Sequence, residues 1–253
     1  MFANARRIWR LCLLAAGCLL AAALLAGPTA LASPLFDGDF ETGNLGQWEN
    51  VQAIPGRITV VRSPVAQGSF SGRFEVRRGD NEPETGDARA EVISGPEYGR
   101  GQTRCFHLRT RIASWDYRHW GFIWQLHDQS GGSPPIALEP KPGAHLWLGD
   151  GSGGSGYWSG RLPRSAKWFD LTVAVRFGSR GSLRVWLNGN AQHMANGRFV
   201  YKKIDTLGQG PDYDKLGIYR SSAATTKAVV YHDDYRVASG SPRRHSPCRE
   251  MNR

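Results

Sequence analysis

Three segments of this sequence carry polar side chains at alternate positions, the spacing that places side chains on one face of a β-strand. These side chains are Arg89 and Glu91, Gln125 and His127, and Lys215 and Tyr219. Cationic and amide groups bind anions, while an imidazole and a phenol can transfer protons. Taken singly, each pair has a simpler explanation, either as solvated polar residues or as the end of a buried strand. Together they predict a site if the three strands share one sheet.

The segment from Trp120 to Asp128 is the one around which the other two are expected to lie. Period-two alternation divides it into an apolar face and a face that ends in Gln and His. The predicted core face holds Trp120, Phe122, Trp124 and Leu126, and the opposite face holds Gly121, Ile123, Gln125 and His127. In the third segment Gly217 lies between Lys215 and Tyr219, where the lack of a side chain suits close approach of a ligand.

The composition indicates an all-β protein. The chain has 253 residues with 31 glycines and nine tryptophans, and no long stretch has helical periodicity. Alternating stretches predict further strands at residues 57–62, 70–78, 88–93, 104–113, 144–149, 169–177, 182–187 and 228–238. Asn188–Gly189 is a favoured pair for a tight hairpin turn. These elements predict one β domain over residues 33–238.

The first 32 residues have the features of an export signal. Arg6, Arg7 and Arg10 flank the start of an apolar run from Leu11 to Ala26, and residues 30–32 form a small-residue cleavage site. We therefore expect a signal peptide over residues 1–32 and a secreted protein, extracellular or periplasmic, that keeps no membrane attachment after cleavage. The remaining chain is long enough to bury a sizeable core.

Four cysteines divide between the signal and the rest of the chain. Cys12 and Cys18 lie in the signal, where Cys18 ends a lipoprotein-like box that offers an alternative mode of export. Cys105 and Cys248 remain, and an even pair in an oxidising compartment predicts a disulfide. That bond would tie the domain to residues 239–253, a polar and basic tail for which we expect disorder. The alternative is two thiols, because Cys248 lies in that tail.

The charge of the chain is basic. The formal charge is +10, and removal of the three signal arginines lowers it to +7. In an exported protein this balance indicates an anionic glycan or surface as the partner. The sequence has no helix-turn-helix, zinc-finger or RNA-binding signature, so we expect no nucleic-acid partner. We expect the protein to be a monomer.

In order and spacing, the three segments resemble the signature strands of jelly-roll polysaccharide lyases, Arg-x-Glu, Gln-x-His and Lys-x-Gly-x-Tyr. Alginate lyases of family seven carry these strands, and the glucuronan lyases and heparin lyase I are similar. The glucuronan and heparin lyase group is the most similar because of Phe-Glu-x-Gly, Trp-Gln-x-His, Val-Trp-Leu-Asn-Gly, Gly-Ile-Tyr-Arg and a late Asp-Asp. The resemblance covers about residues 37–237. Alginate lyases have a second Arg where this chain has Ile93, so alginate is a less suitable substrate.

The resemblance implies a two-sheet antiparallel jelly roll of the concanavalin type whose concave face binds a polyuronate. It implies that Tyr219, His127, Gln125 and Arg89 are catalytic and that Glu91, Lys215 and Arg220 bind the substrate. The reaction would be a β-elimination, in which the proton at carbon five of a uronic acid is removed while its carboxylate is stabilised. No metal or organic cofactor is expected in this chemistry.

The residue types suit these roles. Arg89 and Gln125 are expected to hold the carboxylate with help from His127. Tyr219 is expected to act as base and then as acid, because cations such as Lys215 and Arg220 would lower its pKa from about 10. Two alternatives are a non-catalytic carbohydrate-binding module on the same sandwich and a glycoside hydrolase. The first needs aromatic residues and no acid/base pair, and the second needs two close carboxylic acids, which Glu91 lacks nearby.

A structural calcium ion is predicted where the two ends of the domain meet. Glu41 in the Phe-Glu-x-Gly opening and Asp233 in the last strand would be its side-chain ligands, with backbone carbonyls completing the shell. Asp234 is the alternative ligand, because a one-residue error in strand phase exchanges the two acids. The competing interpretation is a solvated acidic loop.

Overall fold

The computed structural model describes residues 34–162 and 167–240 together with Cys248 and Met251. Residues Ser33–Arg253 form one compact unit. The predicted signal peptide lies outside the described residues, as does the predicted tail apart from Ser239, Gly240, Cys248 and Met251. No helix in the described part of the chain is long and apolar enough to cross a membrane.

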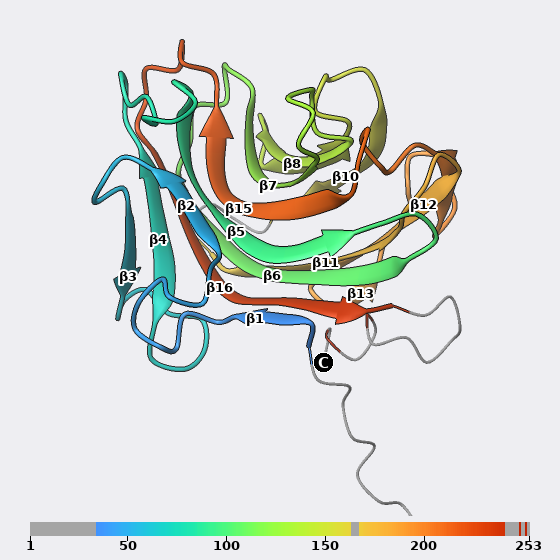
Figure 1. The fold of residues 1–253 in the computed structure, drawn as a ribbon, viewed down its shortest axis with the longest axis horizontal. Helices are drawn as coiled ribbons and strands as arrows, with labels where there is room; N and C mark the ends of the chain where they lie inside the picture. The colour runs from blue at the N-terminus through green and yellow to red at the C-terminus, as the bar shows by residue number, and fades with distance from the viewer. Residues whose placement is uncertain (1–33, 163–166, 241–247, 249–250, 252–253) are drawn as a thin grey trace, which may run out of the picture. The chain divides into compact units, whose positions relative to one another are not determined.

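The described residues form sixteen strands in two antiparallel sheets, which Figure 1 shows as nested curved layers. The outer sheet contains β1 (Phe36–Gly38), β3 (Ile58–Val61), β4 (Ser71–Val76), β6 (Thr103–Ser114), β11 (Phe169–Arg176), β12 (Gly181–Leu187), β13 (Asn190–Ala191), β14 (Tyr201–Ile204) and β16 (Ala228–Ser239). The inner sheet contains β2 (Asn50–Ala53), β5 (Ala88–Tyr98), β7 (Gly121–His127), β8 (Ile136–Lys141), β9 (His145–Gly149), β10 (Gly156–Arg161) and β15 (Asp212–Arg220). The predicted all-β sandwich is confirmed.

The strand orders bring distant segments together. The outer sheet follows β13-β12-β11-β6-β16-β4-β3, with β1 on β16 and β14 on β12, and the inner sheet follows β10-β9-β8-β7-β15-β5-β2. The three segments with alternating polar residues are therefore the neighbouring strands β7, β15 and β5. Of these three strands, β15 comes last in the sequence but lies between β7 and β5 in the sheet.

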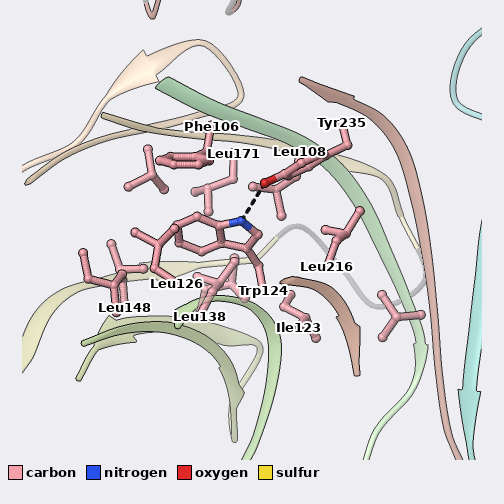
Figure 2. Close-up of a cluster of buried hydrophobic side chains, with 14 of the residues drawn as sticks. Phe106, Leu108, Ile123, Trp124, Leu126, Leu138, Leu148, Leu171, Leu216 and Tyr235 are labelled. Carbon is pink, nitrogen blue, oxygen red and sulfur yellow. Dashed lines mark hydrogen bonds between the residues drawn. The ribbon is translucent and has the colours of Figure 1, made fainter. Parts of the chain in front are cut away.

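The hydrophobic core fills the space between the sheets, because each sheet turns one alternating face inward. Phe106 and Leu108 of β6 meet Trp124 and Leu126 of β7 there, and all four are fully buried. Trp124 Nε1 donates a hydrogen bond of 3.0 Å to the hydroxyl of Tyr235 on β16 (Figure 2). This bond satisfies the one polar atom of the indole in the core and links the two sheets.

A buried carboxylate fixes the central strand of the inner sheet. Asp214 of β15 accepts hydrogen bonds from Ser94 Oγ at 2.6 Å, Tyr98 OH at 2.5 Å and Tyr235 OH at 2.6 Å. The donors come from β5 and β16, so the network joins β15 to its sheet neighbour and to the opposite sheet. Because neighbouring residues of a strand point to opposite faces, inward Asp214 sends Tyr213 and Lys215 to the outward face.

The predicted alternation of the Trp120 segment is wrong at its start. Trp124 pairs with Leu216, but after a register shift Phe122 pairs with Tyr219. Ile123 is fully buried in the core, whereas the Phe122 ring lies 6.1 Å from that of Tyr219. Trp120 precedes the strand and is 45% exposed. The cause is a β-bulge, which breaks the period-two phase that the prediction assumed.

The predicted disulfide is confirmed. Cys105 of β6 is bonded to Cys248, with their Cα atoms 5.1 Å apart, a normal separation for this bond. Both residues are buried. The end of the chain is thus attached to the central part of the outer sheet, and β16 itself continues to Ser239, one residue past the predicted end of the domain.

Candidate active site

The face of the inner sheet that points away from the hydrophobic core carries a cleft of about 790 Å³. Arg89, His127, Lys215 and Tyr219 are among the residues that line it. The fully buried Gln125 lies in the same three strands, paired with Lys215, and the nearly fully buried Glu91 is paired with Gly217. The structure therefore brings six of the predicted site residues together on β5, β7 and β15.

A cationic cluster lies at the β5 side of the cleft. Gln52 Oε1 accepts hydrogen bonds from Arg89 Nη1 at 3.2 Å and Lys215 Nζ at 2.9 Å. Arg89 Nη2 also donates to Asp87 at 2.5 Å. Neither Gln52 nor Asp87 was predicted from the sequence. No sequence pattern marks Gln52, because it lies on the short edge strand β2. Asp87 lies two residues before Arg89 and belongs to the same alternating face, so the alternation could have indicated it.

Glu91 holds the amide of the Gln-x-His strand. Gln125 Nε2 donates to Glu91 Oε1 at 2.6 Å, and Glu91 Oε2 lies 3.6 Å from Arg89 Nη1. Glu91 is only 1% exposed, so the structure places it beneath the cleft and not in it. Gln125 Oε1 has no hydrogen-bond partner among the described residues. Glu91 was predicted to bind substrate; its contacts are those of a residue that positions Gln125 and Arg89.

His127 has the protonation state of a general base. Its Nδ1 is hydrogen-bonded to the backbone carbonyl of Asp128, so Nδ1 carries the hydrogen and Nε2 the lone pair. Burial lowers the pKa of His127, and the nearby positive charge of Lys215 lowers it further, against the effect of the Asp128 hydrogen bond. The imidazole is therefore neutral at neutral pH and can accept a proton at Nε2.

The register gives His127 a tyrosine neighbour that the sequence analysis missed. Tyr213 pairs with His127 across β15 and β7, and the two rings are 6.1 Å apart. Tyr219 pairs with Phe122, five residues along β7 from His127, which corresponds to about 16 Å of strand. Tyr213 precedes Lys215 by two residues and shares its face, so the same period-two argument could have found it.

The predicted lowering of the Tyr219 pKa does not occur. Burial raises the pKa of Tyr219, and the negative charges of Asp87 and Glu91 raise it further, although Arg89 opposes them. The guanidinium carbon of Arg89 lies 4.2 Å from the centre of the Tyr219 ring. Burial also raises the pKa of Tyr213. Both phenols are protonated at neutral pH, a state that suits a proton donor and not a base.

Two further predictions about β15 are wrong. Arg220 was expected to bind substrate, but it lies on the opposite face from Tyr219, where it donates to the backbone carbonyl of Thr226. Gly217 was expected to make room for a ligand. It has a φ of 138°, and a Cβ there would collide with the Ala90 carbonyl and come within 2.8 Å of the Phe74 ring. The glycine is required by the backbone conformation and by packing.

The two predicted calcium ligands lie against one loop. Glu41 accepts hydrogen bonds from the amides of Ser69 and Phe70 at 3.0 Å, and Asp233 Oδ2 accepts one from Ala66 at 2.8 Å. Asp233 Oδ1 is buried without a hydrogen-bond partner among the described residues. Asp234, the alternative ligand, instead binds Arg236 and lies 3.5 Å from His107. Of Asp233 and Asp234, it is therefore Asp233 whose side chain contacts the same loop as Glu41.

Comparison with known protein families decides the class of this chain. The family model for polysaccharide lyase matches residues 40–236, which include every strand of the cleft. The chain belongs to the polysaccharide lyase family. It is an enzyme of that class, and the cleft with its cationic cluster and neutral imidazole is the candidate active site of this lyase. No curated protein sequence matches this lyase closely enough to count as a relative.

Solved structures with the same fold include both lyases and hydrolases. The endo-β-1,4-glucuronan lyase from the fungus Trichoderma reesei is 15% identical with a TM-score of 0.62, over 85% of this chain and 99% of that one. A family 7 alginate lyase is 14% identical with a TM-score of 0.50, over 75% and 85%. The catalytic domain of a glycoside hydrolase family 131 protein from Coprinopsis cinerea is 16% identical with a TM-score of 0.59, over 82% and 94%. At these identities the likeness concerns the fold.

Proposed function

We propose that this lyase cleaves a uronic-acid-containing polysaccharide by β-elimination. The observation that supports this most is the placement of the linked cations Arg89 and Lys215 in the same cleft as a neutral His127. A carboxylate bound by these cations would gain the stabilisation that makes its neighbouring carbon–hydrogen bond acidic. The arrangement thus supplies the anion site and the base that an elimination needs.

In the proposed reaction, His127 Nε2 removes the proton at carbon five of the uronic acid. The electrons form a double bond between carbons four and five as the bond from carbon four to the glycosidic oxygen breaks, and a tyrosine donates a proton to that oxygen. Arg89 and Lys215, which line the cleft, stabilise the charge that develops on the carboxylate, and the fully buried Gln125 lies beneath them. Glu91 contributes by holding Gln125, not by contacting the sugar.

The register favours Tyr213 over Tyr219 as the proton donor. Acid and base must act on adjacent atoms of one sugar linkage, and Tyr213 lies opposite His127 while Tyr219 lies opposite Phe122. Tyr219 then serves with Arg89 in binding the sugar. Tyr213→Phe removes only the hydroxyl and keeps the ring, so it should lower kcat by about 100-fold to 10,000-fold through loss of the proton donor. Tyr219→Phe is the matched control and should mainly raise KM; the reverse pattern would return the donor role to Tyr219.

The function is tested by the product. Glucuronan, heparin, hyaluronan and alginate are incubated with the enzyme, and ultraviolet absorbance of the unsaturated product is recorded. A hydrolase would instead release reducing ends without absorbance. That alternative has little support in the cleft. Glu139 is paired with Lys141 at 2.7 Å and Asp87 with Arg89, and the pKa values of the other two carboxylates, Asp128 and Asp150, lie below their ordinary value, whereas a general acid needs a raised pKa. Binding without any cleavage would favour the carbohydrate-binding module.

We further propose that Glu41 and Asp233 hold a structural calcium ion. The described residues contain no group of three or more metal-ligating side chains, so backbone carbonyls of the loop at residues 64–70 would supply the other oxygens. The unpartnered Asp233 Oδ1 would gain a partner from the ion. The chemistry of elimination does not use this site. A chelator should lower the melting temperature and elemental analysis should find calcium; an unchanged melting temperature without bound metal would eliminate the site.

We also propose export through the signal at residues 1–32, with the mature chain acting on glycans outside the cytoplasm. The support is the order of a basic segment, an apolar run and a small-residue site. N-terminal sequencing of protein from the culture medium or periplasm should begin at Ser33. A lipid-modified N-terminus at Cys18 would support the lipoprotein alternative.

A further inference from the structure

The charges that line the cleft do not match those of a densely anionic polymer. Four carboxylates, those of Asp87, Asp128, Glu139 and Asp150, line it together with the cations Arg89, Lys141 and Lys215. With His127 neutral, the formal balance of the cleft is negative although that of the whole chain is +10. The basic residues that make this protein positive therefore lie mainly outside the substrate cleft.

One cluster of cations is arranged for one carboxylate. Arg89 and Lys215 are joined through Gln52, as described above, and Ile93, which pairs with Lys215, adds no charge beside them. Asp87 pairs with Arg89 at 2.5 Å, so this cluster keeps a formal charge of one positive unit among the side chains that line the cleft, which matches one carboxylate. The third cation, Lys141, is paired with Glu139 at 2.7 Å, and it lies 5.3 Å from the centre of the Trp147 ring. A second uronate of the same polysaccharide would find no comparable cationic cluster among the residues that line the cleft.

Two fixed negative charges lie near the His127 end of the cleft. Asp150 accepts hydrogen bonds from Ser152 Oγ at 2.5 Å and Gly154 N at 3.0 Å. Asp128 accepts corresponding bonds from Ser130. Burial opposes ionisation of both, but the hydrogen bonds outweigh it, so each pKa lies below its ordinary value. A carboxylate on the adjoining sugar would be repelled by both anions, whereas a neutral sugar would not.

Aromatic surfaces extend the cleft beyond the cationic cluster. Trp120 is 45% exposed and lies edge-on to Tyr219 with ring centroids 5.0 Å apart. Trp147 of β9 also lines the cleft and is half-buried, and by strand order both tryptophans lie on the β7 to β10 side of the cationic cluster. Flat indole surfaces contact the apolar faces of sugar rings and require no charge on the sugar. They suit neutral sugar units next to a single uronate.

We propose that the cleft selects a glycan in which each uronic acid is flanked by neutral sugars and discriminates against homopolymers of uronic acid. This proposal rests on the proposed β-elimination and names the substrate class for it. The experiment compares poly-glucuronate with heteropolysaccharides that carry one uronate per repeat between neutral sugars. Formation of the unsaturated product is measured at matched uronate concentration and physiological ionic strength.

We expect kcat/KM to be at least about tenfold higher on a heteropolysaccharide than on the homopolymer, as for two to three weak repulsions that add. Equal or faster cleavage of the homopolymer would overturn the substrate class and leave the β-elimination intact. Failure to form unsaturated product from either class would overturn the proposed function, and the substrate class with it. The two failures are therefore distinguishable.

A charge variant gives a second readout. Asp150→Asn keeps a hydrogen-bond acceptor for its loop and removes one negative charge, so the ratio of kcat/KM on the homopolymer to kcat/KM on the heteropolysaccharide should rise about threefold. The matched control is Glu49→Gln, which removes an exposed carboxylate that does not line the cleft and should change neither rate. An equal response of both substrates to Asp150→Asn, or no response, would contradict repulsion by Asp150.

Discussion

At the scale of single residues, burial sets the protonation states in the cleft. Burial disfavours the charged form of every group, so it lowers the pKa values of His127 and Lys215 and raises that of Tyr219. Burial raises the pKa of Tyr213 as well, so the neutral imidazole of His127 lies beside a protonated phenol, the pairing of base and acid that the proposed elimination requires. Neighbouring cations are therefore not needed to ionise a tyrosine.

The pH profile should show this base. In the proposed mechanism His127 must be neutral, so kcat/KM should fall as the pH drops through the pKa of His127, which lies below its ordinary value of 6.5. The acid limb of the wild-type profile on the preferred substrate should accordingly lie below pH 6.5. Melting temperatures over the same pH range control for unfolding. An acid limb well above pH 6.5 would be inconsistent with His127 as the base.

Activity should depend on the planar guanidinium of Arg89 and not only on its positive charge. Arg89→Lys retains one positive charge but loses the planar fork that contacts Gln52, Asp87 and the Tyr219 ring. We expect kcat/KM to fall by about 10-fold to 100-fold, with both KM and kcat affected, because the proposed contact with the substrate carboxylate would exist before the transition state and strengthen in it. Steady-state kinetics measure the effect, and wild-type values for the variant would remove Arg89 from the carboxylate site.

At the scale of elements, β15 organises the active site. Asp214 anchors its inner face through three hydroxyl groups, while Tyr213, Lys215 and Tyr219 occupy its outer face. The bulge against β7 then sets which residues of the two strands are opposite each other. A shift of one residue would replace the site residues with core residues, so the position of the bulge is as important as the residues themselves.

Gly217 tests this dependence on β15. Gly217→Ala would place a methyl group against the Ala90 carbonyl and Phe74 at a φ that L-residues rarely adopt, so we expect the free energy of unfolding to fall by about 2 to 4 kcal/mol. Denaturant unfolding measures the loss. Gly210→Ala is the control, because a Cβ at that position has no neighbour within 4 Å. Equal stability of the two variants would show that β15 tolerates a side chain there.

At the scale of the whole molecule, the disulfide closes most of the domain into a loop. Cys105 and Cys248 are 143 residues apart in the sequence, and closing a loop of this length stabilises the folded state by about 5 kcal/mol in the chain-entropy model. The bond attaches the last residues of the chain to β6, a central strand of the outer sheet. The disulfide and the candidate active site thus lie on different sheets.

Loss of this bond should therefore affect stability more than catalysis. Cys248→Ala should lower the free energy of unfolding by about 2 to 5 kcal/mol and leave kcat/KM nearly unchanged below the melting temperature. Thermal unfolding with and without reductant measures the effect, since reductant should destabilise wild type and not the variant. Peptide mapping without reduction should yield the linked Cys105 and Cys248 peptides, and their absence would contradict the bond.

Local sequence patterns determined the fold class and most members of the site. Period-two alternation identified β5, β7 and β15 and assigned Arg89, Gln125, His127, Lys215 and Tyr219 to polar faces, because side-chain direction along a strand is a local property. The even pair of cysteines likewise predicted a disulfide. The alternation failed at Phe122 and Ile123, where pairing with a bulged neighbour reset the phase.

Only the tertiary structure decided how these residues work together. The register between β7 and β15 placed Tyr213, and not Tyr219, opposite His127, and edge strand β2 contributed Gln52 from 37 residues before Arg89. Burial reversed the expected shift of the Tyr219 pKa. Register, burial and the charge of a cleft depend on segments that are distant in sequence, so no local pattern contains them.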